Sequence, residues 1–368
     1  MIQVHKIANM RNINYYIQLI CFVSTFQYFC HCNYSNKKEH SPDNNIAEHA
    51  ICPEVSDATL FTQKQKDCQL LMDAFKNPAA TKVLDLATKC VLEELPAEIC
   101  NLTNLIEINL DGTHLKSLPS EIGNLTNLEL LDIAYNPIAE LPPTIAKLHN
   151  LKSLILDGIY FPIFPLEIGK LTALEKLSYR SYGEENKVLT FFPPEIFNLI
   201  NLQYLDLYEH KFKSLPNEIG NLKNLKILIL DSNQLGALPA EIGNLINLEK
   251  LGLFMNRLSA LPPEIGNLEK LQYLDLEVNY LSTLPPEITN LLNLQQLELM
   301  GNAFLTALPD EIGNLSSLSY LNIAETGISY LPTSFCDLNN LETLLIGNLN
   351  ISNLPEIRVC LPGTYIIQ

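Results

Sequence analysis

Residues 238–284 read LPAEIGNLINLEKLGLFMNRLSALPPEIGNLEKLQYLDLEVNYLSTL, which is two copies of the pattern LPxEIGNLxxLxxLxLxxNxLxx. The Leu-Pro pair, replaced by Phe-Pro at Phe164 and Phe192, recurs from Leu95 to Leu354. The interval is 23 residues nine times, with one interval of 24 and one of 28. A fixed period of this length predicts a solenoid, in which each repeat buries its apolar face by stacking on its neighbours.

Each part of the repeat predicts a local structure. Leu251 and Leu253 alternate with Gly252, so a short strand would point the leucines inward and the intervening residue outward. Asn256 follows where the chain must turn, and its amide can bond backbone groups of its own and adjacent turns. The Pro-x-Glu-Ile segment predicts a short helical turn, with proline at its first position and glutamate near the positive end of its dipole.

These repeats resemble those of leucine-rich repeat (LRR) proteins. The LPxEIGNLxxLxxLxLxxN wording is similar to the subclass found in Ras-binding scaffolds, plant Ras-group-related LRR proteins and LRR proteins of host-associated microbes. The resemblance implies an α/β solenoid of about 12 repeats, shaped as a horseshoe with a parallel sheet on its concave face and short helical turns on its convex face. One fold of this kind hosts many unrelated functions.

The sequence predicts five segments along the chain. Residues 1–32 resemble a secretory signal peptide or an uncleaved anchor, because a mildly basic start precedes an apolar, aromatic run. A buried N-terminal helix is the alternative. Residues 33–51 are polar and predict a linker, 52–82 an N-terminal cap, 83–355 the repeats and 356–368 a C-terminal cap.

Six of the nine cysteines follow the proposed signal, and none lies between Cys100 and Cys336. They therefore flank the repeats, where a solenoid needs caps, and an even number suits disulfides in a secreted protein. We expect Cys52 to pair with Cys68 and Cys336 with Cys360. The alternative is that Cys100 and Cys336 are free thiols, since each occupies the small-residue position of EIG.

The formal net charge of -17 argues against a nucleic-acid partner, which clustered Lys and Arg would recognise. About half of it comes from the nine glutamates of the helical turns. The three columns around the strand leucines hold ten acids against the bases Lys176, Arg180 and Lys250. An acidic concave wall with aromatic anchors predicts a basic protein or peptide as partner. The alternative is that these charges only keep the sheet soluble.

The middle repeats depart from the pattern together. The ladder asparagine becomes Ile159, Tyr182 and His210 in three consecutive repeats, and an insertion falls around residues 183–190. Such departures are expected at functional sites, although repeat decay with aromatic filling is an equal alternative. We therefore predict a partner-binding surface that consists of Arg180, Tyr182, Tyr204, Asp206, Tyr208, Glu209, Asp231, Phe254, Tyr273, Asp275 and Glu277.

The sequence contains no GxxxxGK[ST], HExxH, GxSxG or kinase signature, so we expect no enzyme activity, cofactor or metal site. The favoured function is a non-enzymatic, protein-binding LRR protein that is secreted or displayed on the cell surface. The first alternative is a cytoplasmic signalling scaffold that binds a GTPase or phosphatase, as the Ras-pathway resemblance implies. An LRR effector enzyme is a third, for which no residue offers support.

Overall fold

The computed structural model describes residues 68–182 and 188–368. The chain divides into the units Met1–His49 and Ala50–Gln368, and all described residues belong to the second. The proposed signal or anchor, the linker, Cys52 and the start of the predicted N-terminal cap lie outside the described residues.

The described residues form one sheet of 13 parallel strands in sequence order. The strands are β1 Val83–Asp85, β2 Glu107–Asn109, β3 Leu130–Asp132, β4 Ser153–Ile155, β5 Lys176–Ser178, β6 Tyr204–Asp206, β7 Ile227–Ile229, β8 Lys250–Gly252, β9 Tyr273–Asp275, β10 Gln296–Glu298, β11 Tyr320–Asn322, β12 Thr343–Leu345 and β13 Tyr365–Ile367. The predicted solenoid with a parallel sheet is confirmed. The last strand, β13, lies within the segment predicted as a C-terminal cap and extends the sheet beyond β12.

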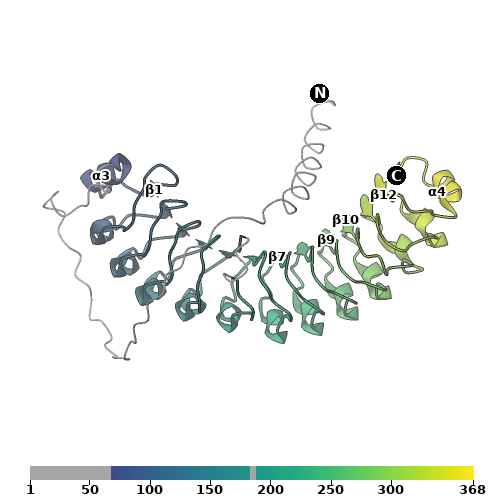
Figure 1. Ribbon diagram of the computed structural model, residues 1–368, viewed down its shortest axis with the longest axis horizontal. Helices are drawn as coiled ribbons and strands as arrows, with labels where there is room; N and C mark the ends of the chain where they lie inside the picture. Colours follow the sequence, from purple (N-terminus) through teal and green to yellow (C-terminus); the bar gives the residue numbers. More distant parts are fainter. Residues whose placement is uncertain (1–67, 183–187) are drawn as a thin grey trace, which may run out of the picture. The chain divides into compact units, whose positions relative to one another are not determined.

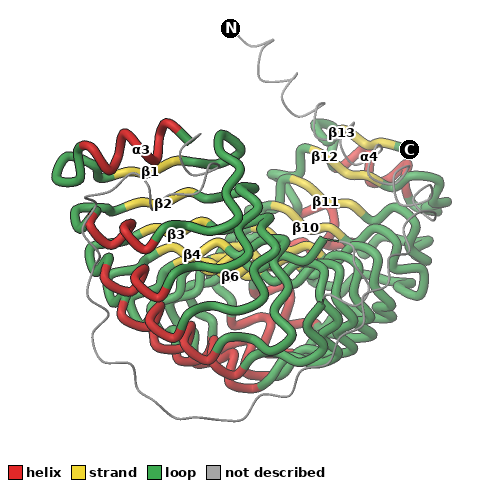
Figure 2. The backbone as a smooth tube through the Cα atoms, turned by 60° about the vertical axis from the view of Figure 1, so that its left-hand side comes forward, coloured by secondary structure: helices red, strands yellow, loops and turns green. Residues whose placement is uncertain are grey.

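The repeats follow an arc whose inner edge is lined by the strands (Figure 1), with the helical turns on the outer side (Figure 2). Neighbouring strands pair in equivalent register, so that Leu251 of β8 lies between Leu228 of β7 and Leu274 of β9. These leucines are fully buried, which places the intervening side chains on the concave face, as predicted.

The outer turns are single 3-10 helices, η2 Ala97–Asn101, η3 Ser120–Asn124, η4 Pro143–Lys147, η5 Leu166–Lys170, η6 Pro194–Asn198, η7 Asn217–Asn221, η8 Ala240–Asn244, η9 Pro263–Asn267, η10 Pro286–Asn290, η11 Ile312–Asn314 and η12 Thr333–Asp337. The α-helices α3 Gln69–Lys76 and α4 Leu354–Cys360 flank them. The expectation that the Leu-Pro proline opens the helix was wrong. Pro239, for example, is the extended residue before η8, and only a second proline, such as Pro263, stands at the first helical position.

The asparagine ladder is confirmed. Asn256 donates to the carbonyls of Leu230 and Leu253, at 2.9 and 3.2 Å, and accepts from the amide of Leu235 at 3.0 Å. The ladder satisfies backbone groups that the tight turns would otherwise leave buried and unpaired.

His210 takes over the role of a ladder asparagine. Its Nε2 lies 2.8 Å from the carbonyl of Tyr179, and its Nδ1 accepts from the amide of Leu189 at 3.2 Å. This pattern requires the neutral ring with its proton on Nε2. Burial lowers the pKa of His210 to about 4, against a smaller upward effect of the Tyr179 carbonyl.

The other departures from the repeat are divided between core and surface. Tyr179 replaces a strand leucine and packs against Phe161, Phe164 and His210, with ring centroids 5.0–5.8 Å apart. The predicted alternative of aromatic filling therefore applies to these buried residues. Tyr182, in contrast, is 45% exposed.

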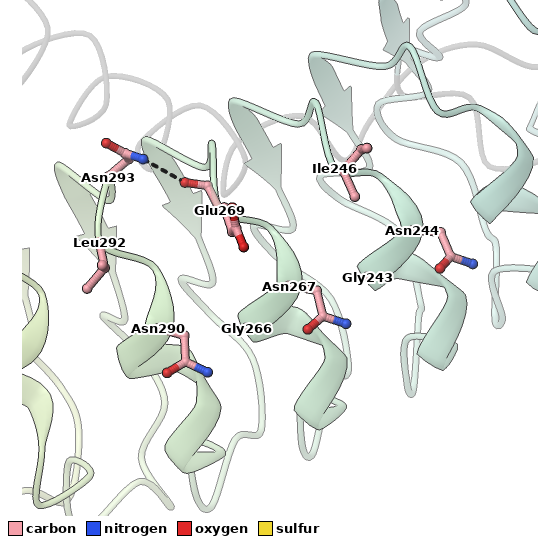
Figure 3. A pocket seen from close by; sticks show the side chains of 9 residues that line it. All are labelled: Gly243, Asn244, Ile246, Gly266, Asn267, Glu269, Asn290, Leu292 and Asn293. Carbon is pink, nitrogen blue, oxygen red and sulfur yellow. Dashed lines mark hydrogen bonds between the residues drawn. The ribbon is translucent and has the colours of Figure 1, made fainter.

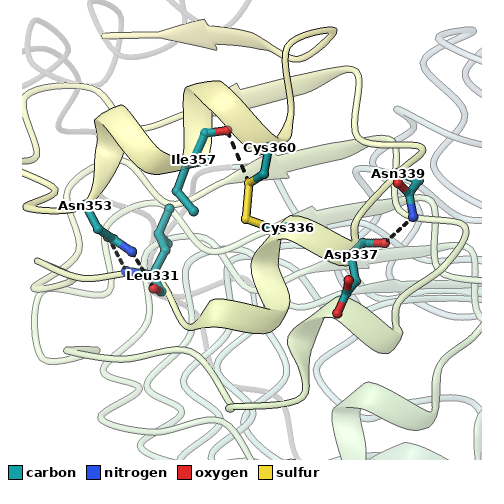
Figure 4. Close-up of a disulfide and its surroundings, with 7 residues drawn as sticks. All are labelled: Leu331, Cys336, Asp337, Asn339, Asn353, Ile357 and Cys360. Carbon is teal, nitrogen blue, oxygen red and sulfur yellow. Dashed lines mark hydrogen bonds between the residues drawn. A yellow bond between two sulfur atoms is a disulfide. The ribbon is translucent and has the colours of Figure 1, made fainter.

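Disulfides join each cap to its neighbouring repeat. Cys68 bonds to Cys90, and Cys336 bonds to Cys360 (Figure 4). The expected Cys336–Cys360 pair is confirmed, but the expected pairing of Cys68 with Cys52 was wrong, because Cys90 in the first repeat lies against the start of α3. Cys100 is disulfide-bonded as well, so neither Cys100 nor Cys336 is a free thiol.

Among the residues described, no helix has both the length and the apolar character needed to cross a bilayer.

Candidate functional site on the concave face

Five of the predicted residues form one cluster where β5 and β6 present their side chains. We call Arg180, Tyr182, Tyr204, Asp206 and Tyr208 the arginine–tyrosine patch. Arg180 Nε donates to Asp206 Oδ2 at 2.7 Å, and the Tyr204 hydroxyl donates to the same oxygen at 2.9 Å. Arg180 Nη2 makes a closer contact with that oxygen, and the amide of Tyr208 donates to Asp206 Oδ1 at 3.2 Å.

Asp206 was predicted to contact a partner, and that role was wrong. Its side chain is 0% exposed, whereas the side chain of Arg180, which covers it, is 37% exposed. A buried carboxylate with four hydrogen-bond contacts fixes the groups above it. Asp206 therefore positions Arg180 and Tyr204, and these two residues present the surface.

Ionisation of the patch is fixed by the same contacts. Burial acts to lower the pKa of Arg180, but its hydrogen bond and charge attraction to Asp206 outweigh burial and raise it. Burial, followed by the charge of Asp206, raises the pKa of Tyr204 to about 12. Arg180 is therefore charged and Tyr204 is a neutral donor throughout the physiological range.

The patch continues into a row of rings, Tyr135, Tyr182 and Tyr208, which we call the tyrosine strip. The ring centroids of Tyr135 and Tyr182 are 5.2 Å apart, and those of Tyr182 and Tyr208 are 6.4 Å apart. Tyr135 was missed by the sequence analysis because it lies in the turn after β3, outside the three strand columns. The sequence feature that could have revealed Tyr135 is Gly158, which occupies the same turn position one repeat later and leaves room for the tyrosine ring.

The second half of the concave face carries an acid cluster, defined as Asp231, Asp275, Glu277 and Glu298. Burial raises the pKa of Asp231 to about 7, with a further contribution from the charge of Asp275. Burial also raises the pKa values of Glu277 and Glu298, and the two carboxyl groups are hydrogen-bonded to each other. At neutral pH this cluster therefore holds protons that exposed carboxylates would have lost.

Neutral donors support the acid cluster more than cations do. Asn322 Nδ2 donates to Glu277 Oε1 at 2.8 Å, and the Tyr273 hydroxyl donates to Asp275 Oδ2 at 3.1 Å. Lys250 lowers the pKa values of Asp231 and Asp275 by its charge, but its ammonium lies 4.5 Å from the ring centroid of Tyr273. Glu298 Oε2 is the one buried side-chain polar atom in the described part of the chain without a hydrogen-bond partner.

Glu298 and Asn322 were absent from the predicted site, although both stand in the column between the strand leucines. Glu298 lies in register between Asp275 and Asn322. Of the remaining predicted residues, Phe254 is half-buried above Asp231, which accepts its amide hydrogen at 2.9 Å. Glu209 is half-buried and lies in the left-handed turn after β6, with φ 60°, at the turn position equivalent to Tyr135.

A groove of about 730 Å³ lies on another surface, between the helical turns and the starts of the strands (Figure 3). Its walls are repeat residues such as Asn244, Asn267 and Asn290, and Asn293 donates there to the Glu269 carbonyl at 2.8 Å. Equivalent bonds recur along the solenoid, for example from Asn247 to Lys223, so the groove follows from regular stacking. In the described residues, no group of three or more His, Cys, Asp or Glu is arranged to hold a metal ion.

A family model described as a leucine-rich repeat region matches residues 59–192 and 240–319, more than half of the chain. A model for a single leucine-rich repeat matches residues 224–245. The chain therefore belongs to the leucine-rich repeat family. No curated protein sequence matched it.

Several solved structures are similar. An LRR protein of Leptospira interrogans is 31% identical, with 81% of this chain and 98% of that chain covered and a TM-score of 0.48. The plant peptide hormone receptor RGFR1, in complex with RGF2, is 29% identical with a TM-score of 0.56, covering 69% of this chain and 41% of that one. TLR13, in a complex with ssRNA13, is 28% identical with a TM-score of 0.62, covering 72% and 39%. The chain thus spans less than half of either receptor chain.

Proposed function

We propose that this protein is a non-enzymatic binding protein that recognises a protein or a basic peptide through its concave face. The observation that carries the proposal is the arginine–tyrosine patch, in which a buried carboxylate holds Arg180 and Tyr204 in place. Preorganised aromatic and arginine side chains are the residues that most often dominate binding energy.

The acid cluster supports a basic partner, because its carboxyl groups gain a counter-charge when a cation docks. The similarity to a receptor bound to a peptide hormone supports a peptide as one form of that partner. The exclusion of nucleic acid that we drew from net charge has no support from the comparisons, since a similar structure is a TLR13–ssRNA13 complex. We favour a protein or peptide because the concave columns carry few cations.

We place the protein outside the reducing cytosol, either secreted or on the cell surface. The cysteine pairs at both ends of the repeats support this location, since disulfides persist in oxidising compartments. They weigh against the intracellular signalling scaffold. Mass spectrometry of the mature protein tests the location: loss of about thirty N-terminal residues with oxidised thiols would support it, and an intact start with free thiols would contradict it.

The binding surface is tested by Tyr204→Ala combined with Tyr208→Ala in the full chain. We expect affinity for a captured partner to fall by about thirtyfold, the loss typical of a hot spot, while melting changes little. Tyr330→Ala is the control, because Tyr330 is exposed but precedes Leu331-Pro332, away from the strands. Equal capture by the double variant and the control would remove the patch from the proposal.

A further inference from the structure

Tyr135 and Tyr182, which follow β3 and β5, form an exposed aromatic pair at one end of the tyrosine strip. Tyr135 is 51% exposed and Tyr182 is 45% exposed, and their side chains are hydrogen-bonded to each other. Their rings are tilted by 40° and are not stacked face to face. Two large aromatic side chains thus remain partly open to solvent although they are held in a fixed relation.

The fold creates this pair by omitting a side chain at Gly158. A Cβ placed on Gly158 would lie 2.8 Å from Cδ1 of Tyr135, too close for any side chain without displacement of the ring. Gly112 occupies the equivalent turn position two repeats earlier and is also left-handed, with φ 63° against 71° for Gly158. A Cβ on Gly112 would meet only Thr88, at an ordinary 3.6 Å. The close approach at Gly158 is therefore to the Tyr135 ring, and Gly112 has no such contact.

Negative charge surrounds the pair. Asp111 and Asp157 both act electrostatically on Tyr135. Burial raises the pKa of Asp132, and the charges of Asp111 and Asp157 raise it further, while Lys176 offsets only part of this. Arg180 is the nearest guanidinium, and it bonds Asp206, forms an ion pair with Asp157 at 3.9 Å and hydrogen-bonds Tyr182. The carboxylates of Asp111 and Asp132 lie outside these contacts and so lack a full counter-charge.

We propose that the Tyr135–Tyr182 pair, bordered by Asp111, Asp132 and Asp157, is the docking point for an arginine side chain of the partner. This inference rests on the proposed function and names the chemical group that this part of the concave face receives. A cation is attracted to the ring faces and to the carboxylates together. A guanidinium fits better than an ammonium, because it is planar, weakly hydrated and stacks on aromatic rings.

The test uses capped tetrapeptides of arginine, lysine or citrulline as probes, so it does not depend on identifying the natural partner. Binding to the full chain is measured by titration calorimetry. We expect tetra-arginine to bind more tightly than tetra-lysine, and tetra-citrulline to bind least. Tyr135→Leu should weaken tetra-arginine binding by about fivefold, whereas Tyr135→Phe, which keeps the ring, should retain it.

Gly158→Ala and Gly112→Ala form a matched pair. Both place alanine in a left-handed turn, but only the first pushes the Tyr135 ring aside, so only Gly158→Ala should weaken arginine binding. If Gly158→Ala fails to fold, Tyr135→Leu decides the question, because that side chain is half exposed. Asp132→Asn should lower affinity for tetra-arginine and leave the weak citrulline binding unchanged.

Equal effects of the two glycine variants would overturn the proposal, as would full tetra-arginine binding by Tyr135→Leu. Lysine or citrulline binding as tight as arginine binding would overturn the assignment of a guanidinium. None of these variants changes Tyr204 or Tyr208. Failure of the proposed function would therefore be seen in the partner-capture experiment, and failure of this inference would be seen in the peptide titration.

Discussion

The arginine–tyrosine patch and the acid cluster are built from the same columns of the same sheet, yet they handle their carboxylates in opposite ways. Asp206 in β6 and Asp275 in β9 occupy equivalent positions, and in each repeat a tyrosine two residues earlier donates to the carboxylate. Asp206 also has Arg180 above it, whereas Asp275 faces Glu277 and Glu298. The presence of Arg180 therefore neutralises the carboxylate of Asp206 within the protein, whereas the equivalent carboxylate of Asp275 has no arginine above it.

This difference gives the two regions of the concave face different roles in the proposed binding. The patch is rigid because its charges are satisfied within the protein, which suits shape recognition. The acid cluster holds protons at neutral pH that it can release when a cation docks, which suits a cationic partner. Four substitutions test whether the two regions differ in this way, and they follow in order of expected effect.

Arg180→Ala should give the largest loss of stability. It leaves the fully buried Asp206 carboxylate without its cation, and removal of one member of a buried pair costs about 3 kcal/mol of folding free energy. Chemical denaturation at pH 7 measures the loss. Adding Asp206→Asn should recover most of it, and an additive double variant would mean that the two side chains are not coupled.

His210 should make the middle repeats sensitive to acid. Its pKa is lowered to about 4 in the folded protein, so its stabilising contribution is complete above the unfolded value near 6.5 and is lost as pH falls from there to about 4. The shift corresponds to about 3 kcal/mol over that range. His210→Asn can make the same ladder bonds without titrating, and denaturation between pH 7 and pH 4 should therefore show a shallower slope. An unchanged slope would assign the acid sensitivity to other groups.

Glu298→Gln should stabilise the protein at pH 8. The pKa of Glu298 is raised to about 7 by burial, so its contribution is present at low pH and is lost as pH rises through 7. The amide avoids that loss and can donate to Glu277, for a gain of about 2 kcal/mol at pH 8 and none at pH 4. Glu107→Gln, at an exposed position of β2, is the control, with no change expected at either pH. Destabilisation at pH 8 would show that Glu298 is ionised without strain.

Lys250→Gln should have the smallest effect, a loss of about 1 kcal/mol at pH 7. Its charge lowers the pKa values of Asp231 and Asp275, so the loss should shrink at pH 4, where Asp231, whose pKa is about 7, is protonated. Lys176→Gln is a close match, because Lys176 lies 5.1 Å from the ring centroid of Tyr204 but beside the satisfied patch. Lys176 lowers the pKa of one carboxyl group, Asp132, so the effect of Lys176→Gln should vary less with pH than that of Lys250→Gln. Equal pH dependence in both variants would contradict the proposed contrast.

The fold was predictable because local pattern and global structure coincide in a solenoid. The alternation of Leu251 and Leu253, and the ladder position of Asn256, fix the strand, its buried face and its turn without long-range information. The Cys68 pairing was not predictable, since it depends on where a cap helix docks. The number of possible cysteine pairings exceeds what spacing alone can resolve.

The sequence predicted which strand positions contribute to the candidate site, but not what each side chain does there. The strand columns of the repeat predicted that Arg180, Tyr204 and Tyr208 share one face of the sheet, and these residues lie together there. The columns could not reveal that Asp206 is covered by its neighbours, because the burial of a side chain depends on the lengths of the side chains beside it. Tyr135 escaped notice for a related reason, since its position depends on an absent side chain in the next repeat.

The two cap disulfides have a consequence for how the molecule comes apart. Each repeat packs chiefly on its immediate neighbours, so unfolding begins most readily at a terminus and proceeds inward. Cys68–Cys90 and Cys336–Cys360 each clamp a terminal helix to the adjoining turn. With both ends clamped, the weakest point moves to the centre, where Ile159 and Tyr182 interrupt the asparagine ladder beside the surface proposed to meet the partner.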